Sequence, residues 1–205
     1  MSGVKGLLIA LEGIDGAGNT TQARLLARWL RRLGLGVVLT KEPTKGAVGR
    51  LIRRRLRRKV RDPFLDTLLF AADRAEHVAS VIDPALQRGL VVVTDRYVES
   101  SIAYQGAEGA DMGWVEAVNS FAPRPDLTII LDIHPSQALA RKKGVREGFE
   151  DEDFLLRVRE ILKARACERG YVVVDASKEV TKVHVDVKRA AEGLVKSAFP
   201  SIKRR

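Results

Sequence analysis

The chain has 205 residues, of which 45% are hydrophobic, so it can bury one core and is expected to form a single domain over residues 1–205. The absence of a bilayer-length apolar run and of a signal-peptide pattern favours a cytoplasmic protein without membrane contact, and the single Cys167 excludes an internal disulfide. The net charge of +10 would suit a polynucleotide, but the Lys and Arg clusters lack interleaved aromatic residues, so no nucleic-acid partner is expected.

A glycine-rich turn follows the first apolar run of the chain. Residues 6–11 are predicted to form a buried strand, and the apolar spacing over residues 20–33 has the period of a helix. Between them, Gly13-Ile14-Asp15-Gly16-Ala17-Gly18-Asn19-Thr20 matches the phosphate-binding pattern G-x-x-x-x-G-K-[ST] with one departure. Such a loop surrounds phosphate oxygens with backbone N–H groups at the positive end of a helix. The alternative is an ordinary tight turn, which the register of the three glycines with Thr20 disfavours.

The departure is Asn19, which stands where the pattern has a lysine that contacts the transferred phosphate. Asparagine can donate a hydrogen bond, but it carries no charge and is shorter than lysine. Removing one preorganised donor typically lowers turnover about a hundredfold to a thousandfold. We therefore expect phosphate binding to persist and turnover to be slow, unless a cation from elsewhere, such as Lys5 or a lid residue, substitutes.

The next predicted elements carry charged and aromatic side chains. We expect a strand over residues 36–40, a loop over 41–46, a basic helix over 48–60 and a long helix over 64–81. The arginines of the basic helix have two readings, a solvated face or attraction to phosphate. Helical spacing places Phe70, Arg74 and His77 on one face of the long helix. The simplest alternative is that Phe70 belongs to the core and Arg74 pairs with a carboxylate.

A near-continuous apolar strand over residues 90–94 delivers Asp95 and Arg96 to the carboxyl edge of the predicted sheet. Ligands bind at that edge in open α/β folds. An acid at the end of a second buried strand suits magnesium binding near a phosphate loop, together with the hydroxyl of Thr20. Arg96 offers a bidentate fork for a phosphate group.

The rest of the chain continues the alternation of strands and helices. The predicted elements are helices over residues 98–106 and 112–121, a strand over 127–133, a helix from Pro135, a helix over 153–169, a strand over 171–175 and a helix over 179–198. The basic, glycine-containing residues 141–151 have two readings, a lid over polyphosphate or a charged surface loop. The tail, residues 199–205, is expected to be flexible. This order predicts an α/β fold with a five-stranded parallel sheet and helices on both faces.

Three stretches together resemble thymidylate kinase of the P-loop nucleoside monophosphate kinase group. They are Glu12-Gly13-Ile14-Asp15-Gly16-Ala17-Gly18, then Phe70-Ala71-Ala72-Asp73-Arg74, and the run from Asp95-Arg96-Tyr97 to Tyr104-Gln105-Gly106. The resemblance runs from about Lys5 to Val195 and implies the three-layer P-loop NTPase fold with a short basic lid. It also implies that ATP and thymidine monophosphate (dTMP) are the substrates and that Mg²⁺ accompanies ATP.

The resemblance further implies roles for individual residues. Phe70 would stack on thymine, Arg74 would reach its carbonyl edge or the phosphate, and Tyr104 would press on the sugar and disfavour a ribose. The other implied dTMP-binding residues are Asp15, Lys45, Arg96, Ser101 and Gln105. The implied ATP-phosphate loop comprises Gly13, Ile14, Asp15, Gly16, Ala17, Gly18, Asn19, Thr20 and Thr21. Magnesium would be served by Thr20 and Asp95, and adenine would be bordered by Arg141, Ala176, Ser177 and Lys178.

Family members place their catalytic positive charge either in the phosphate loop or in the lid. Gly16 in the loop and basic residues after position 140 make this chain similar to the lid-dependent type. The implied catalytic residues are then Asp15, Arg96, Arg141, Lys142, Lys143 and Arg146. The resemblance also implies a homodimer that pairs through the long helix, with Leu65, Leu68, Leu69 and Val78 as its apolar residues. Two other readings stay open, a nucleotide-binding relative without meaningful turnover and a kinase for another nucleoside monophosphate.

Overall fold

The computed structural model describes residues 6–58, 61–141 and 151–200. Its strands form one parallel sheet in the order β2-β3-β1-β4-β5. The strands are β1 (Leu7–Gly13), β2 (Val37–Lys41), β3 (Val91–Asp95), β4 (Leu127–Asp132) and β5 (Val172–Asp175). The predicted five-stranded parallel α/β fold is therefore confirmed. Among the described helices, none combines the length and hydropathy that crossing a membrane would require.

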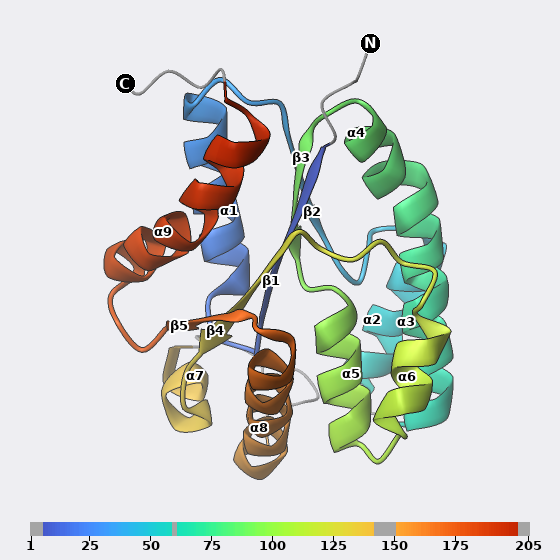
Figure 1. The fold of residues 1–205 in the computed structure, drawn as a ribbon. Helices are drawn as coiled ribbons and strands as arrows, with labels where there is room; N and C mark the ends of the chain where they lie inside the picture. Colours follow the sequence, from blue (N-terminus) through green and yellow to red (C-terminus); the bar gives the residue numbers. More distant parts are fainter. Residues whose placement is uncertain (1–5, 59–60, 142–150, 201–205) are drawn as a thin grey trace.

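Helices connect successive strands and cover both faces of the sheet (Figure 1). They are α1 (Asn19–Arg32), α2 (Ala47–Arg57), α3 (Pro63–His77), α4 (Asp83–Gln87), α5 (Val98–Ala107), α6 (Met112–Val118), α7 (Pro135–Arg141), α8 (Glu152–Arg169) and α9 (Val180–Ala198). In Figure 1, α1 and α9 lie on one side of the sheet, and α3 and α4 lie on the other. The result is a three-layer arrangement with the sheet in the middle.

Alternating residues of the central strands supply two separate cores. Leu7, Ile9 and Leu11 of β1 face a core that includes α1, α8 and α9, whereas Leu8 and Ala10 face a smaller core that includes α4. Side chains of a strand point alternately to its two faces, and here both faces are covered. This double burial explains why the central strands are apolar at nearly every position rather than at every second one.

The long helix predicted over residues 64–81 differs from the structure at its C-terminal end. α3 ends at His77 and continues through a π-helical turn, Val78–Ile82, into α4. Pro84, in the first turn of α4, has no N–H to donate, and a wider turn accommodates such a residue without breaking the helical path. The predicted helix over residues 112–121 is also shorter, because α6 ends at Val118.

The sheet determines where the chemically active residues lie. Register places Lys41 of β2 opposite Asp95 of β3, and Asp95 opposite Leu11 of β1. The carboxyl ends of three parallel strands therefore meet beside the loop that joins β1 to α1. This edge is where open α/β folds bind their ligands.

Candidate active site

The loop between β1 and α1 has the backbone that a phosphate cradle requires. Gly16 and Gly18 have φ values of 87° and 103°, in the region that favours glycine. A Cβ on Gly16 would lie 2.4 Å from the carbonyl oxygen of Ala138, so a larger residue does not fit there. Gly18 precedes α1, and no side chain caps the helix at that position. The first amide groups of α1 are thus available to an anion.

The side chains of the loop contribute less than its backbone. Ile14 and Ala17 are buried, at 2% and 3% exposure, so only their backbone groups can face a ligand. Asn19 is also buried, and its Nδ2 donates to the carbonyl oxygen of Gly13 over 3.2 Å. Its Oδ1 has no hydrogen-bond partner within the described part of the chain. Asn19 therefore ties the loop to its own start and supplies no charge to it.

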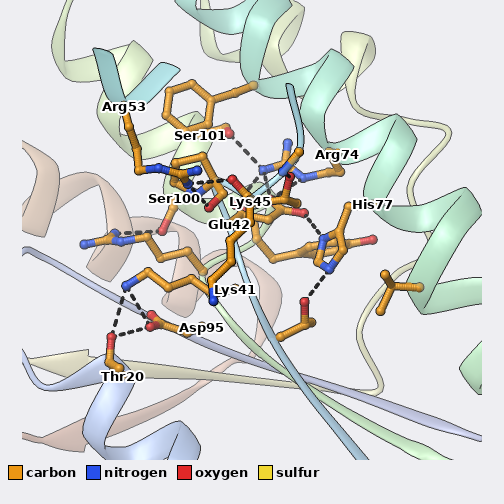
Figure 2. A pocket seen from close by; sticks show the side chains of 18 of the residues that line it. Thr20, Lys41, Glu42, Lys45, Arg53, Arg74, His77, Asp95, Ser100 and Ser101 are labelled. Carbon is orange, nitrogen blue, oxygen red and sulfur yellow. Dashed lines mark hydrogen bonds and ion pairs between the residues drawn. The ribbon is translucent and has the colours of Figure 1, made fainter. Parts of the chain in front are cut away.

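Thr20, Asp95 and Lys41 form a compact group next to this loop (Figure 2). The Thr20 hydroxyl donates to Asp95 Oδ2, and Lys41 Nζ lies 3.0 Å from both oxygens. Asp95 is 2% exposed, and its Oδ1 is without a hydrogen-bond partner among the described residues. Sequence reasoning missed Lys41, because its contact with Asp95 depends on the strand order that places β2 beside β3.

The oxygen donors of this group suit Mg²⁺, which prefers hard oxygen ligands and keeps several water or phosphate ligands. The unpartnered, buried Asp95 Oδ1 is a further observation in favour of such an ion. In the described ranges, no group of three or more His, Cys, Asp or Glu side chains is arranged to hold a metal. Thr20 and Asp95 would therefore be the protein's part of a site completed by nucleotide phosphates and water.

Arg96 joins the phosphate loop to α5. Its backbone φ of 73° is unusual for a residue other than glycine, and such strained positions cluster at functional sites. Its guanidinium lies 2.5 Å from Asp15 Oδ1, and it donates to the Gly13 carbonyl over 2.9 Å and to Ser100 Oγ over 3.0 Å. The hydroxyl of Tyr104 accepts a hydrogen bond from the Asp15 amide over 2.9 Å. The structure therefore brings Asp15 next to Arg96 and Tyr104, which lie 81 and 89 residues further along the chain.

A buried charge network lies deeper in the same region (Figure 2). The Arg74 guanidinium is held by Glu42 at 2.6 Å and donates to Ser101 Oγ over 3.0 Å, to the Tyr97 carbonyl and to the Asn119 side chain. The second Glu42 oxygen lies 2.9 Å from His77 Nδ1, whose ring also contacts Thr40. Glu42, which sequence reasoning missed, ends up 2% exposed immediately after β2. Arg74 thus pairs with a carboxylate, as the simpler sequence reading proposed.

One cavity of about 1030 Å³ connects these groups. Its lining contains the cation-binding candidates Thr20 and Asp95 together with Lys41. It also contains the residues implied for the acceptor: Asp15, Lys45, Phe70, Arg74, Arg96, Ser101, Tyr104 and Gln105. The described structure therefore places the candidate acceptor residues and the phosphate-loop threonine on a single continuous space.

The residues implied for adenine meet at a different place. Arg141, at the end of α7, donates to the carbonyl oxygens of Ala176 over 2.8 Å and of Ser177 over 3.0 Å, with a longer contact to Lys178. These residues do not line the cavity described above. The other implied lid cations, Lys142, Lys143 and Arg146, lie outside the described residues.

Glu12, at the carboxyl end of β1, is another buried acid that sequence reasoning did not single out as a site residue. It is 0% exposed and accepts a hydrogen bond from Ser100 Oγ. Burial raises the pKa of its carboxyl from 4.5 to about 7, a rise that the Ser100 hydrogen bond and the nearby Arg96 partly oppose. The Glu12 carboxyl therefore loses its proton near neutral pH.

Replacing Glu42 by Gln should destabilise the fold by about 3 to 5 kcal/mol, because the Arg74 charge would remain buried without its carboxylate. Urea denaturation would measure the loss. The matched control is Glu160→Gln on α8, whose side chain is 57% exposed, and we expect a change below about 0.5 kcal/mol there. Equal effects of the two substitutions would contradict the importance of the buried pair.

Glu12→Gln should change how stability depends on pH. Because the pKa of folded Glu12 lies above its unfolded value, the free energy of unfolding falls as pH rises from about 4.5 to about 7. The shift corresponds to a loss of about 3 kcal/mol in the free energy of unfolding of the native protein. The Glu12→Gln variant should not show this loss. Denaturation of both proteins between pH 4 and 8 measures the difference. A difference that is the same at every pH would rule out the raised pKa.

The comparisons with known proteins agree with this geometry. The family model for thymidylate kinase matches residues 11–187. A probable thymidylate kinase of Pyrobaculum calidifontis is 46% identical over 201 residues, which cover 97% of this chain and 100% of that protein. Probable thymidylate kinases of Pyrobaculum aerophilum and Pyrococcus abyssi are 47% and 45% identical, over 92% and 90% of this chain and 97% and 95% of theirs. With the phosphate loop, the Asp95-Arg96 turn and the cavity in place, the chain belongs to the thymidylate kinase family.

Proposed function

We propose that this protein transfers the terminal phosphate of ATP to dTMP, giving ADP and thymidine diphosphate. The observation that carries the proposal is the single cavity, which joins Thr20 and Asp95 beside the phosphate loop to the pocket of Phe70, Arg96 and Tyr104. Direct phosphoryl transfer requires both substrates in one space, with the acceptor in line with the transferred group. Membership of the thymidylate kinase family supports the choice of dTMP.

In the proposed reaction, an oxygen of the dTMP phosphate attacks the γ-phosphorus of ATP. The bond between that phosphorus and the bridging oxygen breaks, and ADP leaves with the bond's electrons. Arg96 holds the acceptor phosphate with its guanidinium, while Lys45 lies exposed on the same cavity. Asp15 orients Arg96 through their 2.5 Å ion pair. Phe70, Tyr104 and Gln105 would hold base and sugar.

The backbone of Gly13 to Thr21 would cradle the ATP phosphates, and Mg²⁺ would bind Thr20 and Asp95. When bound, this ion neutralises charge on the phosphate oxygens as the phosphoryl group is transferred. Adenine would lie against residues 176–178, whose loop Arg141 fixes through carbonyl contacts. The lid, with Lys142, Lys143 and Arg146, stays a prediction, as does the cytoplasmic location.

A coupled assay of ADP release from ATP and Mg²⁺ tests the proposal, with dTMP, thymidine, UMP and AMP as alternative acceptors. We expect turnover with dTMP and at least about a hundredfold lower kcat/KM with the ribonucleotides, because Tyr104 would crowd a ribose 2′-hydroxyl. Preference for UMP or AMP would indicate a kinase for another nucleoside monophosphate. Calorimetric dTMP binding without any ADP release would indicate a nucleotide-binding relative, the outcome that Asn19 alone would favour.

We further propose a homodimer that pairs through α3 and α6. Large apolar side chains are exposed on α3, at 63% for Phe64 and 41% for Leu68, and just after α6, at 48% for Phe121. Phe64 stacks on Trp114 of α6 with ring centroids 4.7 Å apart. Exposed apolar patches of this kind commonly mark interaction surfaces. Val78, which the sequence reading included in this surface, is instead 6% exposed in the core beside the sheet.

Leu68→Asp should convert the dimer to a monomer, because an isologous contact would bury two copies of the new charge. Sedimentation equilibrium at micromolar concentration measures the mass. Val185→Asp, at a 47% exposed position on α9, is the control and should leave the mass unchanged. A native protein of monomer mass, or a Leu68→Asp variant of dimer mass, would refute this interface.

A further inference from the structure

The phosphate loop, Gly13 to Thr20, contains no cationic residue, so we considered the cationic side chains that surround it. The Asn19 amide is neutral, and its Nδ2 donates to the Gly13 carbonyl, so this side chain supplies no charge to a phosphate. The cationic side chains on the cavity are Arg24, Lys41, Lys45, Arg53, Arg74 and Arg96. Of these, Lys41 is the one whose ammonium group donates to Thr20, the residue that follows Asn19, within the described part of the chain.

We propose that Lys41 replaces the phosphate-loop lysine and contacts the terminal phosphate oxygens of ATP. This inference rests on the proposed function for the identity of the phosphate donor. It assigns to the end of β2 a role that sequence patterns assign to the first turn of α1. The ammonium group of Lys41 would reach the same phosphates as the lysine of the pattern, but from the end of β2.

Three of the other cations of the cavity are already held by protein oxygen atoms, whereas Arg24 and Lys45 lie exposed on α1 and after β2. Arg74 is buried and held by Glu42, and Arg96 is held by Asp15 and the Gly13 carbonyl. Arg53 donates to the carbonyl oxygens of Pro43 and Thr44. Lys41 is also paired, with Asp95 and Thr20, but its side chain is 53% exposed, far more than those of Arg74 and Arg96.

The position of Lys41 follows from the sheet. Because Lys41 is the last residue of β2 and pairs in register with Asp95, its side chain is anchored at the edge where Thr20 and Asp95 converge. Its Nζ lies 3.0 Å from Thr20 Oγ1, the atom expected beside the β- and γ-phosphates. A flexible lysine stem lets the ammonium group exchange Asp95 for a phosphate oxygen when ATP binds.

A competing reading is that Lys41 only neutralises the buried Asp95 carboxylate. The two readings make opposite predictions. If Lys41 only neutralises Asp95, its removal frees Asp95 and should leave ATP binding unchanged or make it tighter in the presence of Mg²⁺. If Lys41 contacts phosphate, its removal should weaken ATP binding even without a divalent ion, because the lost interaction is with the nucleotide itself.

A double-mutant cycle between positions 41 and 19 tests the proposal. Lys41→Met should lower kcat about a hundredfold in the native background, the typical cost of one lost preorganised donor. In the Asn19→Lys background, the same substitution should cost less than about tenfold, since the loop then has its own lysine and the two effects are not additive. Equal losses in both backgrounds would overturn the proposal.

Calorimetry of ATP binding in EDTA gives a second readout that does not depend on turnover or on the metal. We expect Lys41→Met to raise the Kd for ATP about tenfold or more, Lys41→Arg to preserve most of the affinity, and Asn19→Lys to restore it in the double variant. Lys196→Met is the matched control, because Lys196 is 54% exposed and also pairs with a carboxylate, Glu192. It should bind ATP and turn over as the native protein does.

These measurements separate the two proposals. If the native protein binds ATP but phosphorylates no nucleotide, the proposed function fails, while the EDTA titrations still decide the role of Lys41. If dTMP is phosphorylated and Lys41→Met binds ATP as tightly as the native protein, the role of Lys41 fails and the kinase assignment stands. Thermal denaturation of each variant verifies that weaker binding does not come from unfolding, and Lys41→Arg provides a charge-preserving comparison.

Discussion

The contact of Arg96 with the phosphate loop is the interaction on which the candidate site depends. One guanidinium binds Asp15, the Gly13 carbonyl and Ser100, so it joins the turn after β3, the loop after β1 and the start of α5. The φ of 73° at Arg96 directs its side chain across this gap, at a cost in backbone energy that the three contacts offset. The loop and the acceptor pocket are thereby held in a fixed relation before any ligand binds.

Charge balance is the second theme of the site. Three buried carboxylates of the site each have a partner. Glu12 accepts a hydrogen bond from Ser100, Glu42 pairs with Arg74, and Asp95 pairs with Lys41. Binding of a polyanionic substrate would require its oxygens to take over cations that are paired with protein carboxylates in this structure. With Asn19 in the phosphate loop, positive charge at the ATP phosphates would have to come from another element.

The fold and most of the site could be predicted from local patterns. The glycine register of the loop, the apolar central strands and Asp95-Arg96 after a buried strand each depend on residues adjacent in sequence, and the structure has them at the expected elements. Lys41, Glu42 and Glu12 were not identified as site residues, because nothing near them in sequence distinguishes a paired, buried charge from a solvated one. Their partners lie 32 to 88 residues away along the chain, apart from the Thr20 contact of Lys41 at 21 residues.

The sequence by itself determined the order of strands and helices, the phosphate loop and the absence of its lysine, because these follow from hydrophobic period and from residue identity at fixed spacing. Only the tertiary structure decided which cation stands beside that loop, which carboxylate Arg74 binds and which long-helix residues reach the surface. Those outcomes depend on strand order and register, which bring Lys41 and Asp95 to the same edge. Which strands pair depends on how helices and strands pack around one core, and the residues of a single strand do not specify this.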